Sequence, residues 1–293
     1  MARRPGRSLA ALLTAAALAA CATGGSTATL PGPSTTTMVS ATTTTSPSSG
    51  SSAAPGTTAV TEIDVDVTVP EGEGPFPAVV LVHGGGWVTG SPAVMRPLAR
   101  ALNEEGFLTV NTRYRLASRG SPGFPGAIED VACAVKLASA HPDGDGTVAV
   151  IGHSAGAHIG AVVALNGDDF ASGCPIGEGS ALPQRFIGLA GPYDVARLES
   201  VLAIFFGVSI SDDPGTWLAG NPLELADANP ELDTLIMYGE NDGLVGDRFA
   251  FEFHERLLDA GVDSLLELVE GARHNDLHDP DVVGGLIVTW LDR

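Results

Sequence analysis

Basic residues are scarce in this sequence: 15 Lys and Arg residues stand against 35 Asp and Glu residues, for a formal net charge of −20. Nucleic-acid binding depends on basic side chains that neutralise phosphates, so we expect no nucleic-acid partner. The same charge disfavours adsorption of the folded domain to an anionic lipid surface. An acidic surface does not identify a substrate, and it is typical of a domain that stays soluble outside the cell.

The N-terminus lacks an apolar run that is long enough to span a bilayer comfortably. Three Arg residues precede residues 9–20, which are short and apolar and end in Ala-Ala directly before Cys21. Residues 1–20 resemble a bacterial lipoprotein signal peptide, with Cys21 as the lipid-modified first residue. The alternative is an ordinary secretory signal and an unmodified Cys. We therefore expect an exported protein that is anchored to the membrane and faces outward, or that is secreted if Cys21 carries no lipid.

Charged side chains are missing from residues 22–60, of which about half are Ser or Thr, with Pro and Gly between them. A segment of this composition buries too little apolar surface to fold. We therefore predict a disordered tether over residues 21–60. A length of 293 residues fits one large domain plus tails, so residues 61–293 are expected to form a single catalytic domain.

Cysteine is rare, and only Cys133 and Cys174 remain after Cys21. Cys133 lies on a predicted helix, and Cys174 lies on a loop after the next predicted helix. In an oxidising compartment the two are able to pair, and we predict a disulfide. Two buried free thiols are the alternative, because the sequence does not give the distance between them.

Apolar runs typical of strands alternate with amphipathic patterns typical of helices throughout residues 61–293. The expected strands are 62–69, 76–82, 107–111, 148–151, 186–190, 235–238 and 265–269, and the expected helices are 93–105, 127–140, 155–165, 245–260 and 281–291. This alternation predicts an α/β fold with a mostly parallel central sheet and helices on both faces. In such a sheet the functional residues follow the carboxyl ends of the strands.

The strongest motif is Gly152–Gly156, with the sequence GHSAG, between an expected strand and an expected helix. A sharp turn from strand to helix exposes the side chain of its central residue, and the flanking glycines avoid collisions. Ser154 is therefore the candidate nucleophile. The backbone N–H of Ala155 is a candidate donor to the oxyanion of an acyl-transfer transition state.

A second glycine motif, HGGGW at His83–Trp87, directly follows the expected strand 76–82. Consecutive glycines allow backbone N–H groups to point into a cavity, as an oxyanion hole requires. A phosphate-binding loop is disfavoured, because no Lys-Ser/Thr pair follows. His83 is expected to brace this loop, and His153 and His158 are expected to have structural roles.

The acid and the base of a catalytic triad are expected later in the chain, each at the end of a strand. Asp242 is the preferred acid, and Glu240 and Asp247 are its alternatives. His274 is the preferred base, and His278 is its alternative. No His, Cys or Asp cluster has the spacing of zinc ligands, so we expect neither a metal nor another cofactor.

The order Ser154, Asp242, His274 is that of the α/β-hydrolases. The sequence resembles this superfamily over residues 61–293, in particular bacterial carboxylesterases with an HGGGW oxyanion loop, of the hormone-sensitive-lipase-like or BD-FAE type. The resemblance implies an α/β-hydrolase fold and cleavage of carboxylic esters through an acyl-enzyme on Ser154. It also implies that Gly85 and Gly86 donate to the oxyanion beside Ala155.

The sequence departs from many of these relatives because only about twenty residues of the domain precede His83. We therefore expect a short N-terminal cap or none, and a relatively open pocket. Residues 196–232, with Phe205, Phe206 and Trp217, form either a small lid or an ordinary part of the core.

Two other functions remain open at this level. Amide hydrolysis, by a formamidase or a peptidase, uses the same triad, and an inactive anchored binding protein uses the same fold. An exported enzyme meets lipid esters, acyl groups of the cell wall or environmental esters. The sequence predicts no oligomeric state.

Overall fold

The computed structural model describes residues 39–40 and 62–293. The predicted signal peptide and Cys21 lie outside the described residues, as does the predicted tether except for two of its residues. These two form the short strand β1 (Val39–Ser40), which pairs antiparallel with β2 (Glu62–Ile63).

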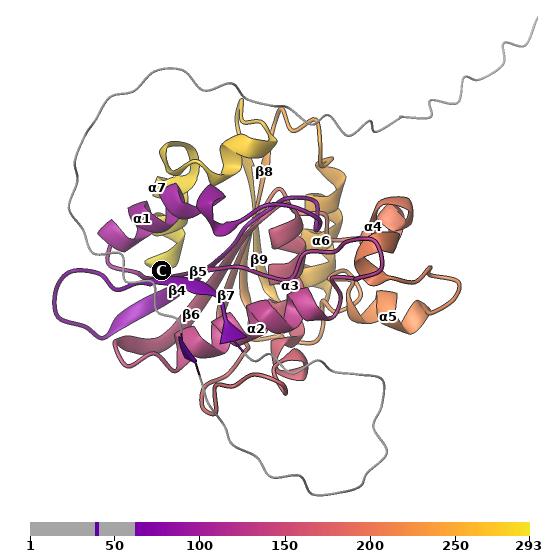
Figure 1. Ribbon diagram of the computed structural model, residues 1–293. Helices are drawn as coiled ribbons and strands as arrows, with labels where there is room; N and C mark the ends of the chain where they lie inside the picture. The colour runs from indigo at the N-terminus through magenta and orange to yellow at the C-terminus, as the bar shows by residue number, and fades with distance from the viewer. Residues whose placement is uncertain (1–38, 41–61) are drawn as a thin grey trace, which may run out of the picture. The chain divides into compact units, whose positions relative to one another are not determined.

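The domain is built on a seven-stranded sheet with the order β3-β5-β4-β6-β7-β8-β9 (Figure 1). Only β3 runs antiparallel to its neighbour, and the other six strands are parallel. The strands are β3 (Val65–Thr68), β4 (Phe76–Val82), β5 (Leu108–Thr112), β6 (Gly144–His153), β7 (Arg185–Leu189), β8 (Asp233–Gly239) and β9 (Asp263–Val269). The mostly parallel α/β sheet predicted from the sequence is therefore confirmed.

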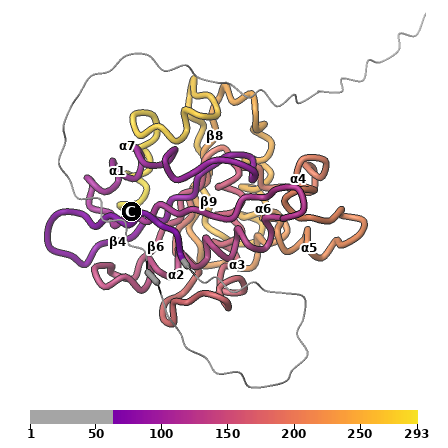
Figure 2. The backbone as a smooth tube through the Cα atoms, in the orientation of Figure 1, coloured from indigo at the N-terminus to yellow at the C-terminus, as the bar shows by residue number. Residues whose placement is uncertain are grey.

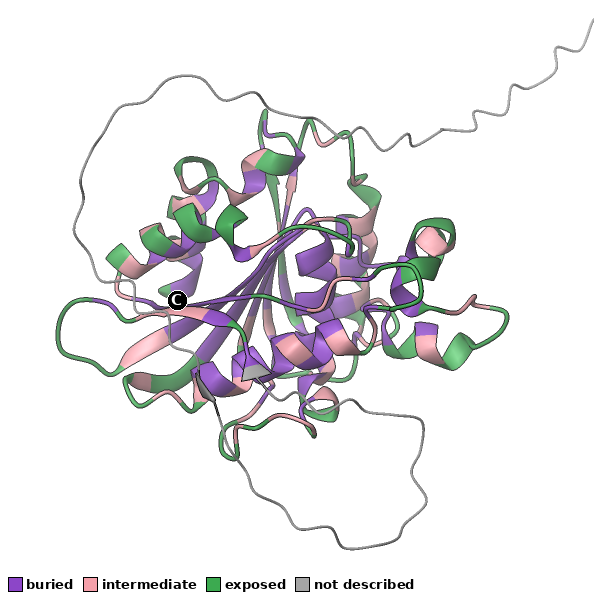
Figure 3. Cartoon of the chain, viewed as in Figure 1, coloured by how far each residue is buried: buried purple, intermediate pink, exposed green. Residues whose placement is uncertain are grey.

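Helices cover both faces of this sheet. They are α1 (Arg96–Glu104), α2 (Gly126–Ser139), α3 (Ala155–Phe170), α4 (Glu199–Phe206), α5 (Pro214–Ala219), α6 (Arg248–Asp259) and α7 (Pro280–Leu291), with short 3₁₀ turns η1 (Pro92–Val94), η2 (Val195–Leu198) and η3 (His274–His278). Core residues of α2, α3 and α6 pack on one face, and those of α1 and α7 pack on the other. Figure 3 shows the buried residues along the strands and on the sheet-facing sides of the helices.

Strand β4 illustrates why the sheet is buried on both faces. Val80 and Val82 belong to the core on the side of α2 and α3, whereas Val79 and Leu81 belong to the core on the side of α1 and α7. All four side chains are inaccessible to solvent. A continuous apolar run is the pattern that such a two-sided environment favours. In the sheet β4 lies between β5 and β6, away from both edge strands.

The segment between β7 and β8 contains η2, α4 and α5 (Figure 2). Its aromatic residues Phe205, Phe206 and Trp217 are buried in the core that also contains α3. Leu218, on the last turn of α5, is 53% exposed. The three aromatic side chains therefore pack as part of the domain.

Cys133 on α2 and Cys174 in the loop after α3 form a disulfide, with their Cα atoms 5.4 Å apart. This separation is typical of disulfides. The predicted pairing is thus present, and it fixes the loop after α3 to the neighbouring helix.

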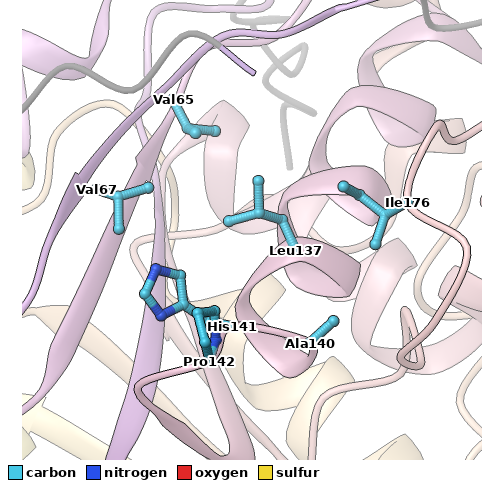
Figure 4. Close-up of a pocket in the computed structure, with 7 residues that line it drawn as sticks. All are labelled: Val65, Val67, Leu137, Ala140, His141, Pro142 and Ile176. Carbon is cyan, nitrogen blue, oxygen red and sulfur yellow. The ribbon is translucent and has the colours of Figure 1, made fainter. Parts of the chain in front are cut away.

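An apolar pocket of about 280 Å³ lies at the β3 edge of the sheet, beside the C-terminal end of α2 (Figure 4). Its walls include Val65 and Val67 of β3, Leu137 of α2, and Ile176. None of the residues predicted for catalysis lines it. Within the described residues, no helix combines the length and the apolar character that crossing a membrane requires.

Candidate active site

Ser154 occupies the turn between β6 and α3 in a conformation that side chains rarely adopt, with φ 55° and ψ −120°. Its N–H donates to the carbonyl of Leu189 at 2.8 Å, which ties the turn to the neighbouring strand β7. A Cβ atom on Gly152 would collide with the backbone of Gly156, and one on Gly156 would collide with the carbonyl of Val82. Both glycines are therefore required for this strained turn. The Ser154 hydroxyl caps no N–H of α3, so it remains available for chemistry.

The loop after β4 passes directly beside Ser154. A Cβ atom on Gly84 would lie 3.1 Å from the Cβ of Ser154. Gly85 and Gly86 have positive φ angles of 132° and 58°. In the described part of the chain, the N–H groups of Gly85, Gly86 and Ala155 donate to no backbone carbonyl. Three donors near the candidate nucleophile are therefore left unpaired by the backbone.

His83 braces this loop from inside the domain. Its ring stacks on Tyr114 at 4.3 Å between centroids, and the Tyr114 hydroxyl donates to the carbonyl of His83 at 3.0 Å. His83 Nδ1 donates to the carbonyl of Gly84 at 2.7 Å. Burial lowers the pKa of His83 and so favours the neutral form of the ring. These contacts agree with the bracing role expected from the sequence.

Asp242 and His274 meet at the carboxyl ends of β8 and β9. His274 Nδ1 lies 2.8 Å from Asp242 Oδ2, and Asp242 Oδ1 accepts from the N–H groups of Leu244 at 2.8 Å and Val245 at 2.9 Å. A carboxylate only accepts, so His274 Nδ1 carries the proton of this hydrogen bond. Burial by itself raises the pKa of Asp242, but the hydrogen bonds from His274, Val245 and Leu244 outweigh it and hold the pKa below its usual value.

The alternative residues have other partners. Glu240 is exposed and accepts from the N–H of Gly271 at 2.9 Å, and Asp247 is exposed at the start of α6. The ring of His278 lies 4.9 Å from that of His153. Of the three carboxylates considered, the structure pairs Asp242 with His274.

His153, which directly precedes Ser154, connects the nucleophile turn to the loop of His274. Its Nε2 lies 2.9 Å from the carbonyl of His274, and since a carbonyl only accepts, Nε2 carries the proton. The ring is buried, and burial lowers its pKa to about 3. The sequence suggested a structural role for His153 but not this contact, because the two residues are 121 positions apart. The only sign of this contact in the sequence was that His153 and His274 both lie near the carboxyl end of a strand.

The described residues contain no group of three or more His, Cys, Asp or Glu side chains that is arranged to hold a metal ion. The site combines the half-buried Ser154, an imidazole oriented by a carboxylate, and backbone N–H groups that donate to no backbone carbonyl. Such an arrangement suits nucleophilic attack on a carbonyl group whose oxygen gains negative charge.

Comparison with known proteins assigns the chain to a family. The profile of the BD-FAE family matches residues 65–257. Esterase LipC of Mycobacterium tuberculosis is 29% identical over 198 residues, which cover 62% of this chain and 48% of LipC. The probable isoprenylcysteine alpha-carbonyl methylesterase ICMEL1 of Arabidopsis thaliana is 26% identical, and the match covers 75% of this chain and 50% of ICMEL1. The chain thus spans about half the length of these relatives.

Solved structures show the same architecture. Esterase Est2 of Thermogutta terrifontis, with propionate bound, aligns with a TM-score of 0.64 at 22% identity, covering 79% of this chain and 87% of that one. A truncated carbohydrate esterase from gut microbiota aligns with a TM-score of 0.66 at 18% identity, covering 78% and 90%. At these identities the likeness concerns the fold.

Proposed function

The chain belongs to the BD-FAE family and has an α/β-hydrolase fold, and we propose that it hydrolyses carboxylic esters with Ser154, His274 and Asp242 as its catalytic triad. The observation that carries the proposal is the hydrogen bond between His274 Nδ1 and Asp242 Oδ2. This bond lies at the carboxyl ends of the strands, where Ser154 also lies. This bond leaves His274 Nε2 as a base for the Ser154 hydroxyl.

Acylation begins when His274 Nε2 takes the proton of the Ser154 hydroxyl and the serine oxygen attacks the ester carbonyl. The carbonyl oxygen becomes an oxyanion, which accepts hydrogen bonds from the free N–H groups of Gly85, Gly86 and Ala155. The tetrahedral intermediate then collapses, the bond to the alcohol breaks, and His274 returns its proton to the leaving alkoxide. The carboxylate of Asp242 stabilises the imidazolium throughout these steps.

Deacylation repeats this sequence with water as the nucleophile. His274 takes a proton from water as the hydroxide oxygen attacks the acyl carbon, and the same N–H groups hold the second oxyanion. Collapse breaks the bond to Ser154, and the serine oxygen recovers its proton from His274. The products are a carboxylic acid and the regenerated hydroxyl.

The direct test compares Ser154→Ala with wild type on p-nitrophenyl acetate and with a fluorophosphonate probe that labels activated serines. The exposed Ser211, between α4 and α5, provides the matched control Ser211→Ala. We expect Ser154→Ala to lose both turnover and labelling, and Ser211→Ala to keep both. Turnover that survives in a folded Ser154→Ala would refute the assignment. Failure of the wild type to react with either reagent would instead favour an inactive binding protein.

Ester rather than amide cleavage is tested with matched acyl groups. The named relatives LipC and ICMEL1 are described as an esterase and a probable methylesterase, which supports the ester. Hydrolysis of p-nitroacetanilide faster than that of p-nitrophenyl acetate would indicate that the substrate is an amide and not an ester. A series of p-nitrophenyl esters of increasing acyl length then identifies the substrate class among lipid, cell-wall and environmental esters.

Export and anchoring through Cys21 form a separate part of the proposal. The support is the positive start, the short apolar run and the small residues before Cys21. Expression in a bacterial host with labelled palmitate should label the wild type, and Cys21→Ala should lose the label and leave the membrane fraction. An unlabelled wild-type protein in the medium would indicate secretion without an anchor.

A further inference from the structure

Trp87 joins the glycine loop to the helix that follows Ser154. It directly follows Gly86, has a φ of 64°, and is 6% exposed. Its indole Nε1 donates to His158 Nδ1 at 2.9 Å. His158 lies on the first turn of α3 and is completely buried, and its own N–H donates to the carbonyl of Ser154 at 3.2 Å. One residue therefore contacts both the nucleophile turn and the loop of the candidate oxyanion donors.

The other ring nitrogen of His158 makes a second bond. An indole N–H only donates, so His158 Nδ1 must be the acceptor and Nε2 must carry the proton. His158 Nε2 lies 2.8 Å from the carbonyl of Gly220, directly after α5, and donates a hydrogen bond to it. Burial lowers the pKa of His158 to about 4, so the ring is neutral at neutral pH and makes both bonds in one tautomer.

Packing holds the two aromatic rings in place. The ring of Phe205, on α4, lies 6.1 Å from that of Trp87 and 5.7 Å from that of His158, measured between centroids. Trp87 and Phe205 belong to the same hydrophobic core, and all three side chains are buried. Movement of the indole would leave a buried N–H without an acceptor, which costs about 1–3 kcal/mol. The indole therefore has one favoured position.

We propose that His158 is a positioning residue that acts through Trp87 to hold the N–H groups of Gly85 and Gly86 where the oxyanion forms. The proposal rests on the proposed function, since it concerns the same site. His158 touches neither the substrate nor the reacting atoms in this account. It sets the position of the glycine loop relative to the Ser154 turn, because both are attached to it.

The kinetic consequence follows from when the donors act. The oxyanion exists only in the transition state and the tetrahedral intermediate, so displaced donors reduce kcat without weakening substrate binding. Loss of one oxyanion donor, or a misplacement of about 1 Å, reduces turnover by about a hundredfold. We expect loss of the Trp87–His158 bond to reduce kcat by about tenfold to a hundredfold at unchanged KM.

The test variant is Trp87→Phe, which removes the indole N–H and keeps a buried aromatic ring. Trp217→Phe is the matched control, because the Trp217 indole is also buried and donates to the carbonyl of Val208 at 3.1 Å. We expect kcat to fall in Trp87→Phe and to stay unchanged in Trp217→Phe. Equal kcat values in the two variants, whether both normal or both reduced, would overturn the proposal.

Variants of His158 separate its two bonds. His158→Leu removes both, whereas His158→Asn keeps an acceptor near the position of Nδ1 and gives up the bond to Gly220. We expect His158→Asn to restore most of the turnover that His158→Leu loses. A folded His158→Leu with the kcat of the wild type, or a His158→Asn as slow as His158→Leu, would contradict the mechanism.

A measurement that needs no substrate tests the positioning role of His158 separately from ester hydrolysis. The exchange of indole N–H protons with deuterium is followed by NMR in the wild type and in His158→Leu. We expect the Trp87 N–H to be protected in the wild type and to exchange faster in His158→Leu, with Trp217 unchanged in both. Rapid exchange of Trp87 in the wild type overturns the tie, whereas absence of ester hydrolysis with a protected Trp87 overturns only the proposed function.

Discussion

Replacement of Asp242 by Asn changes one carboxylate oxygen to an NH2 group and so alters the hydrogen bonds around His274. Both carboxylate oxygens of Asp242 accept hydrogen bonds: Oδ1 from the N–H groups of Leu244 and Val245, and Oδ2 from His274 Nδ1. An Asn side chain has only one acceptor oxygen. If that oxygen keeps the two backbone bonds, the NH2 group faces His274 Nδ1, which must then give up its proton. The proton moves to Nε2, and His274 no longer accepts the proton of Ser154.

The size of the loss in kcat follows from the free energy needed to flip the amide of the introduced Asn side chain. A flipped amide keeps the productive tautomer of His274 but turns its NH2 group toward the N–H groups of Leu244 and Val245. The bond from Leu244 is exposed and that from Val245 is partly buried, so each lost hydrogen bond costs about 0.5–1.5 kcal/mol and the productive orientation is disfavoured by about 1–3 kcal/mol. Since about 1.4 kcal/mol corresponds to a factor of ten, we expect Asp242→Asn to lower kcat by about fivefold to about a hundredfold through this effect.

The assay measures initial rates of p-nitrophenyl acetate hydrolysis, with circular dichroism to establish that each variant folds. Glu240→Gln and Asp247→Asn are the matched controls, since both change an exposed carboxylate to an amide in the same segment. We expect both controls to keep the wild-type kcat. The reasoning is refuted if folded Asp242→Asn turns over as fast as the wild type, or if either control loses as much activity as Asp242→Asn.

Three further predictions concern the loop, the pH dependence and the disulfide. Gly85→Ala should lower kcat more than Gly86→Ala, because a Cβ atom at Gly85 meets the backbone of the same loop and one at Gly86 has open space; kcat values in the opposite order would contradict this. The pKa of His158 is about 4 in the folded state and 6.5 when unperturbed, so the unfolded chain takes up a proton first as the pH falls. The free energy of unfolding should therefore decrease by about 3 kcal/mol between these pH values, and urea unfolding of His158→Asn should lack this part of the decrease. Peptide mapping without reduction should recover Cys133 and Cys174 in one cross-linked peptide. Two separately alkylated peptides would exclude the disulfide. Cys133→Ala should reduce the free energy of unfolding by about 2–4 kcal/mol.

The sheet and its helices were predictable because their signals are local. The apolar run at residues 76–82 matches β4 (Phe76–Val82), and the helix expected at 127–140 matches α2 (Gly126–Ser139). Side-chain periodicity depends only on whether a residue faces the core, which repeats every two residues in a strand and every 3.6 in a helix. Some helix ends moved by a few residues: the helix expected at 245–260 spans Arg248–Asp259. The helix expected at 155–165 ends where predicted, at a kink with non-helical Asn166, and a further helical segment continues to Phe170. Helix ends depend on capping and packing, which periodicity does not report.

The candidate nucleophile was also predictable from local sequence. The turn at Ser154 requires Gly152 and Gly156 because the backbone approaches each within the space of a Cβ atom. This need for glycine on both sides of the serine is visible in a short stretch of sequence. The choice among Asp242, Glu240 and Asp247 was less certain, because all three lie within eight residues after the same strand. The direction of each side chain decided it, and that direction depends on the turn made by Leu244 and Val245.

Sequence alone determined the class of fold, the order of the catalytic candidates along the chain and the identity of the two glycine motifs. Only the tertiary structure decided which side chains meet: Trp87 with His158, 71 residues apart, and His153 with the carbonyl of His274, 121 residues apart. The physical reason is that such contacts depend on the position of one helix or loop against another across the sheet. A shift of one residue in that packing would leave every local pattern intact and would separate the partners.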